Sequence, residues 1–320
     1  MGELDDLLRS RATETRVVGT YLWPTRIIGQ PQWADPYSLT SVISTLRVGK
    51  HRVMITRMGG LFVKPPRSFS DPYSGGPEVG SEDELWRKIE FEVEVARCFN
   101  GVICELALNG LVSAPASPID ISWGQLVDGH ALVLGGSGGR EAYLHRSVQP
   151  LLELLQDNWL TWPVRGEETL KKAARMALTR RLSAISETLP ELVAGAYSNY
   201  SRRQVGEAIA DSWVVTEQVV DYLWQGHVKT VRDKARKDRL KDDRTYSASV
   251  RAEILLTAGA LPEDLYVSVQ RARKLRNDLM HSAKMALPAA TQCVNAMREA
   301  VEFVCGTTVV PPDVTQGVNW

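Results

Sequence analysis

The 320-residue sequence lacks the marks of several common protein classes. Its cysteines are few, isolated and never in a C-x-x-C pair: Cys98, Cys104, Cys293 and Cys305. This spacing argues against a disulfide-stapled secreted domain and against a zinc ribbon, and it favours buried free thiols in a reducing cytosol. No apolar run approaches the length of a membrane span, and the acidic first residues are unlike a secretory signal peptide. We therefore expect a cytoplasmic protein without a membrane partner.

The sequence also lacks an excess of charge of either sign. It has 38 Lys and Arg residues against 38 Asp and Glu residues. A protein that coats nucleic acid indiscriminately would be strongly basic, so the balance argues against that class but still allows a local basic site. The glycine-rich run at residues 135–139 has no Gly-Lys-Ser/Thr ending, and we interpret it as a flexible loop rather than a phosphate-binding loop.

The patterning that is present predicts a mainly helical α+β protein. Strand-like segments at residues 16–23, 52–56 and 61–63 are rich in β-branched and aromatic side chains. Helical periodicity then dominates, at residues 85–106, 167–186, 203–224, 249–258, from 262 onward, and from 288 to the glycine at 306. Because Pro190 and Gly195 are expected to interrupt the chain, we place a boundary at residue 200. The predicted parts are a mixed region at 1–200, a helical bundle at 201–306 and a tail at 307–320.

One predicted helix carries a group of side chains suited to phosphate chemistry. In the stretch Leu275–His281, Arg276 is followed by Asn277, and His281 lies one turn further along. Helical spacing puts Asn277 and His281 on one face, with Arg276 at its edge. A guanidinium beside an imidazole that titrates near neutral pH can hold a phosphate and move a proton.

This stretch resembles the R-[polar]-x-x-x-H signature of the HEPN superfamily, and its Leu-Arg-Asn-x-x-x-His form is especially similar to the HEPN domains that end ApeA-like proteins. The resemblance covers about residues 200–306. Several members are metal-independent ribonucleases in toxin and anti-phage systems, so the resemblance implies a HEPN-like helical bundle with no cofactor. It also implies RNA as substrate, a homodimer with a composite site, and an antitoxin or phage-derived trigger as a further partner. Residues 1–200 would then act as a sensor or select the substrate.

The resemblance implies a role for each residue of the motif. His281 would act as base or acid, Arg276 would stabilise the phosphate, and Asn277 would orient either the phosphate or the imidazole. Attack by the RNA 2′-hydroxyl would leave a 2′,3′-cyclic phosphate and a 5′-hydroxyl. Candidate RNA contacts are the cations around the motif: Arg271, Arg273, Lys274 and Lys284.

Other interpretations of these residues stay open. The same spacing recurs from Arg140 to His145, which shows that the pattern is short enough to arise by chance. Arg276 and His281 could instead form a buried polar contact between helices, in a domain that only dimerises or binds nucleotide or RNA. The charged segment at residues 229–244 is equally consistent with a solvated surface and with an RNA-contacting flank.

Overall fold

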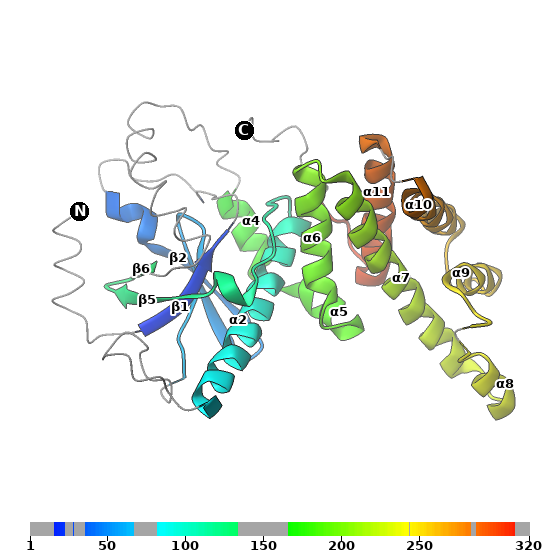
Figure 1. Ribbon diagram of the computed structural model, residues 1–320, viewed down its shortest axis with the longest axis horizontal. Coiled ribbons are helices and arrows are strands. Elements are labelled where there is room, and N and C mark those ends of the chain that lie inside the picture. The colour runs from blue at the N-terminus through cyan, green and yellow to red at the C-terminus, as the bar shows by residue number, and fades with distance from the viewer. Residues whose placement is uncertain are drawn as a thin grey trace. The chain divides into compact units, whose positions relative to one another are not determined.

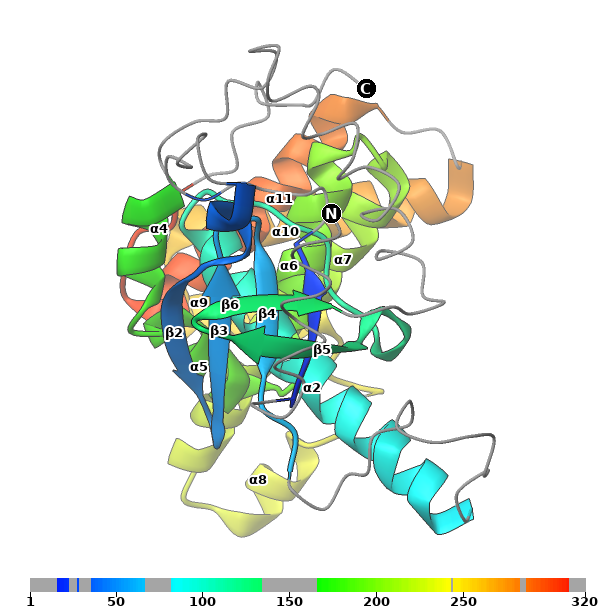
Figure 2. The ribbon, with the colours of Figure 1, turned by 90° about the vertical axis from the view of Figure 1, so that its left-hand side faces the viewer.

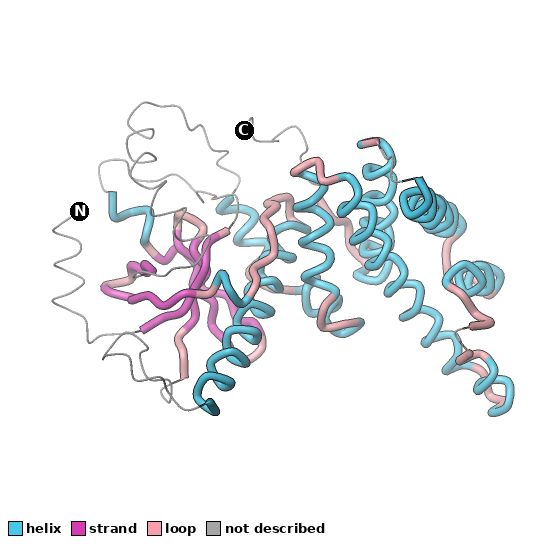
Figure 3. Tube along the Cα trace, viewed as in Figure 1, coloured by secondary structure: helices cyan, strands magenta, loops and turns pink. Residues whose placement is uncertain are grey.

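The computed structural model describes residues 16–22, 28, 36–66, 82–133, 166–242, 244–282 and 286–310. The chain divides into two compact units. The first unit comprises Met1–Ile103 and Ser113–Met176, and the second comprises Cys104–Val112 and Ala177–Trp320. Figure 3 shows that the strands lie in the first unit and that the second is helical. The predicted α+β class with mainly helical content is therefore confirmed.

The first unit contains the sheet, two short 3₁₀ helices, most of one long helix and one short helix (Figure 1). Its elements are β1 (Arg16–Tyr21), η1 (Pro36–Thr40), β2 (Val42–Val48), β3 (His51–Thr56), β4 (Gly60–Val63), α2 (Glu82–Leu108), η2 (Pro118–Asp120), β5 (Ser122–Val127), β6 (His130–Val133) and α4 (Gly166–Ala173). The last residues of α2 belong to the second unit.

The six strands form one antiparallel sheet in the order β2-β3-β4-β1-β5-β6 (Figure 2). Its two edge strands approach each other at one end. Ser41, next to β2, forms an isolated bridge with His130 of β6, and the Val42 N–H donates to the Gly129 carbonyl at 2.8 Å. These contacts curl the sheet towards a barrel, which partly covers strand edges that would otherwise be open to another chain.

The inside of the curled sheet is a small apolar core in which aromatic side chains are prominent. Tyr21 and Phe62 meet edge to face with their ring centroids 5.8 Å apart. The Phe62 ring also lies so close to the backbone of Gly19 and Gly60 that a Cβ at either would come within 2.3 or 2.4 Å of it. Glycine is thus required at both positions because the ring occupies the space of a side chain. All residues of β4 are buried, so the sheet is covered on both faces at its centre.

The second unit is built from α5 to α11 around a long central helix. Its elements are α5 (Ala177–Ile185), α6 (Leu189–Ser201), α7 (Val205–Thr230), α8 (Lys234–Arg239), α9 (Ala248–Thr257), α10 (Glu263–Ser282) and α11 (Leu287–Cys305). Helix α7 packs against α6, α9, α10 and α11. Its buried residues lie on more than one side, while Tyr222 is half exposed.

Two local predictions for residues 167–200 are wrong. Pro190 and Gly195 do not interrupt the chain: Pro190 lies in the first turn of α6, where its missing N–H removes no helical hydrogen bond, and Gly195 is buried within that helix. The predicted helix at 167–186 is broken in two at the buried residue Met176, whose φ of 47° lies in the left-handed region. Both α5 and α6 belong to the second unit, so the division of the structure after Met176 does not coincide with the predicted boundary at 200.

The last described helix, α11, ends at Gly306, as the sequence predicts. Gly306 ends α11 in the left-handed conformation, with φ 59°. The following segment then pairs with the end of α2, where the Val310 N–H donates to the Leu108 carbonyl at 3.1 Å. The four cysteines are free and buried, as predicted. The Arg140–His145 repeat, the 135–139 run and residues 311–320 of the tail lie outside the described residues.

Candidate active site

The predicted motif lies on α10, a helix whose buried side is set by apolar spacing. Leu265, Val269 and Ala272 recur at helical intervals and are buried, and α10 packs on α7, α9 and α11. Helix α10 is seen almost end-on in Figure 1, while α7 runs across the picture, so the two helices cross steeply. Leu279 marks one contact, since a Cβ at Gly206 of α7 would lie 3.9 Å from its Cδ1 atom.

Arg276 continues the buried stripe of α10 and does not point freely into solvent. It lies four residues after Ala272, which places it on the side of α10 that packs on the bundle, and it is half-buried. Its Nη1 donates to Oδ1 of the half-buried Asn277 at 3.2 Å. This bond fixes the amide beside the guanidinium, as an orienting role for Asn277 requires.

Helix α7 supplies one carboxylate, Glu217, within electrostatic range of Arg276. Burial and the charge of Asp221 raise the pKa of Glu217, while the positive charges of Arg276 and Arg251 and a hydrogen bond from Trp213 oppose this rise. Asp221 in turn forms an ion pair with Arg251 of α9, whose side chain is almost fully buried. Arg276 therefore lies within electrostatic range of Glu217, although no ion pair joins these two described side chains.

His281, unlike the half-buried Arg276, is open to solvent. It lies in the last turn of α10 and is exposed, and it makes no hydrogen bond or ion pair with any residue that the structure describes. Its neighbour Met280 is 68% exposed. The imidazole is thus accessible to a ligand or to a second protein chain.

The helix does not bring Arg276 and His281 together within one chain. They are five residues apart, so they leave α10 about 140° apart around its axis. Asn277 and His281 share a side, as expected from their spacing, and Arg276 lies on the adjoining, half-buried side. A single copy therefore presents the guanidinium and the imidazole in different directions.

The cations predicted to contact RNA also differ in exposure. Arg271 and Lys274 are exposed, and Lys274 lies two turns before His281 on the same side of α10. Arg273 is half-buried, and its Nε donates to Oε1 of Gln270 at 3.1 Å. Lys284 lies outside the described residues. The exposed side of α10 thus carries the imidazole and two cations, Arg271 and Lys274, that form no ion pair with a described residue.

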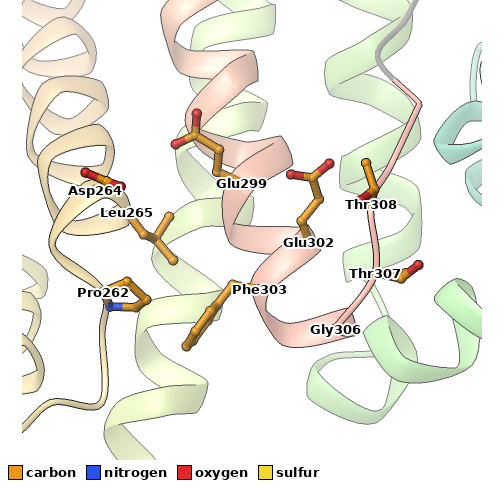
Figure 4. Close-up of a pocket in the computed structure, with 9 residues that line it drawn as sticks. All are labelled: Pro262, Asp264, Leu265, Glu299, Glu302, Phe303, Gly306, Thr307 and Thr308. Carbon is orange, nitrogen blue, oxygen red and sulfur yellow. The ribbon is translucent and has the colours of Figure 1, made fainter.

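An open groove of about 490 Å³ lies at the other end of α10, against the end of α11 (Figure 4). Leu265 and Phe303 give it an apolar wall, whereas its charged residues are acidic: Asp264, Glu299 and Glu302. Asp264 precedes Arg276 by about 18 Å along the helix axis. Carboxylates repel phosphate, so this groove does not suit an RNA backbone and is separate from the motif.

Sequence reasoning did not identify the charged residues of α7 and α9 around the motif. Glu217 and Asp221 are acids on a mostly buried helix, which is a weak signal by itself, and Arg251 has no motif around it. Within the described residues, no group of three or more His, Cys, Asp or Glu side chains could hold a metal ion. None of the helices described is both long and apolar enough to span a membrane.

Comparisons of this chain with protein-family models, with curated proteins and with solved structures found no match.

Proposed function

We propose that this protein is a metal-independent endoribonuclease whose site contains Arg276, Asn277 and His281. The observation that carries the proposal is the exposed His281 imidazole, which lacks a partner among the described residues and shares its helix side with Lys274. RNA provides its own nucleophile, so the protein needs only proton transfer and stabilisation of the charged phosphate.

The proposed reaction breaks one phosphodiester bond and forms another. The 2′-hydroxyl oxygen attacks phosphorus as a base removes its proton, and the 5′-oxygen leaves as an acid gives it a proton. His281 serves as base or acid, because imidazole exchanges protons near neutral pH. Arg276 stabilises the negative charge that gathers on the phosphate oxygens, and Asn277 orients its guanidinium. The products are a 2′,3′-cyclic phosphate and a 5′-hydroxyl.

A homodimer completes the proposed site. Arg276 and His281 of one copy diverge around α10, so a phosphate that touches both groups would draw them from two copies. The exposed Met280 beside His281 supplies apolar surface for such a contact. We further propose a toxin or anti-phage role in the cytoplasm, with an antitoxin or a phage-derived trigger as partner. The region at 1–200 would act as sensor or substrate selector.

The second candidate is a HEPN-like module that dimerises or binds nucleotide or RNA without cutting it. The electrostatic attraction between Arg276 and Glu217 favours it, because opposite charges on α10 and α7 help to join the two helices. In that case Arg276 would stabilise the bundle, and His281 would be a surface residue of a binding face.

Cleavage of an end-labelled single-stranded RNA in excess EDTA separates the two candidates. The wild type should cut it, and His281→Ala should lose at least a hundredfold in rate, the usual contribution of a general acid or base. Val267→Ala is the matched control, since Val267 lies on α10, is remote from the motif and is 46% exposed. A His281→Ala protein that cuts as fast as the wild type would exclude the nuclease proposal. A dimer that binds RNA without cutting would establish the second candidate.

A further inference from the structure

The segment from residue 229 to residue 244 has an excess of positive charge that its own acids do not neutralise. Asp233 accepts from the Arg236 N–H at 2.6 Å and thereby caps α8. Asp238 pairs with Lys241 at 3.0 Å. Asp242 accepts from the Arg244 N–H at 3.1 Å and from the Thr245 hydroxyl at 2.6 Å. Each of these described acids thus has a local structural partner.

The remaining cations of the segment have no such partner. Within the part of the chain that the structure describes, no ion pair or hydrogen bond involves the side chains of Arg232, Lys234, Arg236, Lys237 and Arg239. All of them are exposed except Lys237, which is half-buried. Like charges packed this closely repel each other, so an anion that bound among them would relieve that repulsion.

The segment is also held in place. The carbonyl of the buried Leu240, directly after α8, accepts from Nε1 of Trp224 at 3.2 Å. Trp224 is fully buried on α7, and the Tyr246 ring packs against it with centroids 5.5 Å apart. Figure 1 shows α8 at the end of α7. The cations are therefore presented from an anchored helix rather than from a free loop, which lowers the entropy lost on binding.

We propose that α8 and its flanks, the α8 basic surface (Arg232, Lys234, Arg236, Lys237 and Arg239), form a docking surface for the phosphate backbone of RNA. None of the exposed large apolar side chains lies between Arg232 and Arg239, so the helix has nothing to insert into a lipid surface. A chain with no net charge that concentrates cations here is suited to local phosphate contact. Naming RNA as the polyanion rests on the proposed function.

The position of the α8 basic surface suits a strand that also reaches the motif. Trp224, its anchor, follows Glu217 by two turns, or about 10 Å along α7. Glu217 is the residue of α7 whose pKa responds to Arg276. Phosphates follow one another at about 3.4 Å along one strand of a duplex, so a few nucleotides would cover that axial distance. The surface would hold RNA without reading its sequence, since phosphate contacts carry no base information.

Salt-dependent binding tests the surface. The test measures the affinity of the full chain carrying His281→Ala for a labelled single-stranded RNA at about 0.05 to 0.3 M KCl, a range in which phosphate contacts dominate the salt dependence. In this background the triple variant Lys234→Gln/Lys237→Gln/Arg239→Gln should reduce the slope of log K against log salt by about 2, at 0.7 per phosphate. The matching loss of affinity at 0.1 M salt is about a hundredfold. Lys234→Arg/Lys237→Arg keeps the charge and should keep the affinity.

The charge-preserving variant is the matched control, because it changes the same positions without removing charge. An α8 triple variant with the parent's slope, or an equal loss of affinity in Lys234→Arg/Lys237→Arg, would overturn the proposal. Tighter binding to vesicles rich in phosphatidylserine than to RNA would overturn it as well. Because binding is read in the His281→Ala chain, failure of this surface and failure of the nuclease proposal are distinguishable.

Discussion

Replacement of Glu105 tests how the second unit is held together. Glu105 lies near the end of α2 and is 2% exposed. Its carboxylate accepts from the Thr179 N–H at 2.8 Å and from the Leu178 N–H at 3.5 Å, in the first turn of α5. It thus takes the place of a helix N-cap from a distant part of the chain, because a helix leaves its first N–H groups without internal partners.

Glu105→Ala should lower the free energy of unfolding by about 2 kcal/mol. Loss of an N-cap costs about 1 kcal/mol, and a hydrogen bond to a charged group contributes about 1.5–3 kcal/mol. The removal of a buried charge offsets part of this loss, since burial raises the pKa of Glu105 even though the Thr179 and Leu178 hydrogen bonds oppose the rise. Glu105→Gln keeps an acceptor oxygen, and the Thr179 hydroxyl can accept from its amide, so it should remain within about 1 kcal/mol of the wild type.

Urea denaturation followed by far-UV circular dichroism measures both variants. A raised pKa in the folded state means that the folded protein binds the proton more tightly than the unfolded chain does. The wild type should therefore gain stability relative to Glu105→Gln as the pH falls through the folded pKa towards the unfolded value of 4.5. A Glu105→Ala protein as stable as the wild type, or a glutamine variant as unstable as the alanine variant at pH 7, would refute the capping role.

Three further predictions follow from single contacts. Glu217→Gln, in the His281→Ala chain, should bind RNA about fivefold more tightly at pH 7, because one screened charge interaction of about 1 kcal/mol no longer competes for Arg276; unchanged affinity by fluorescence anisotropy would mean that Arg276 does not touch RNA. Trp224→Phe loses the hydrogen bond to the Leu240 carbonyl and should reduce the free energy of unfolding by about 1–2 kcal/mol in urea titration; no loss would contradict the anchoring of α8. Gly306→Ala strains a left-handed helix end and should cost about 1 kcal/mol, seen as a lower melting temperature, with an asparagine variant in between.

Local patterns predicted much of the helical unit. The intervals of Leu265, Val269 and Ala272 located α10, and Gly306 marked the end of α11. These predictions succeed because one buried stripe and one left-handed residue determine where a helix lies and where it ends. The same logic failed at Pro190, where the proline begins a helix rather than ending one.

The sheet was only partly predictable, although a signal was present. β5 and β6 are joined by Asp128 and Gly129, whose φ angles of 48° and 80° suit a two-residue hairpin turn. An Asp-Gly pair between two short apolar runs is a strong hairpin signal, but the surrounding serines, prolines and glycines favoured an interpretation as loop. Closure of the sheet through Ser41 and His130 depends on pairing between distant segments, which local patterns do not encode.

The residues of the candidate site could be predicted from the sequence, but their burial and their charged neighbours could not. The sequence indicated Arg276, Asn277 and His281 through a short motif, and the helix that carries them is present. That Arg276 is half-buried within electrostatic range of Glu217 while His281 is exposed depends on how α10 crosses α7. Such electrostatic pairing arises from packing between segments far apart in the chain, so the motif alone does not reveal it.

The most direct test of the proposed chemistry is the nature of the cut ends. Mass spectrometry of RNA cut by the wild type in excess EDTA should find 2′,3′-cyclic phosphates and 5′-hydroxyls, and His281→Ala should produce neither. An oligonucleotide with 2′-deoxyribose at the cut position should resist cleavage there, because the attacking hydroxyl is missing. Ends carrying a 3′-hydroxyl and a 5′-phosphate, or cleavage of the deoxy substrate, would contradict 2′-hydroxyl attack at a site built from Arg276 and His281.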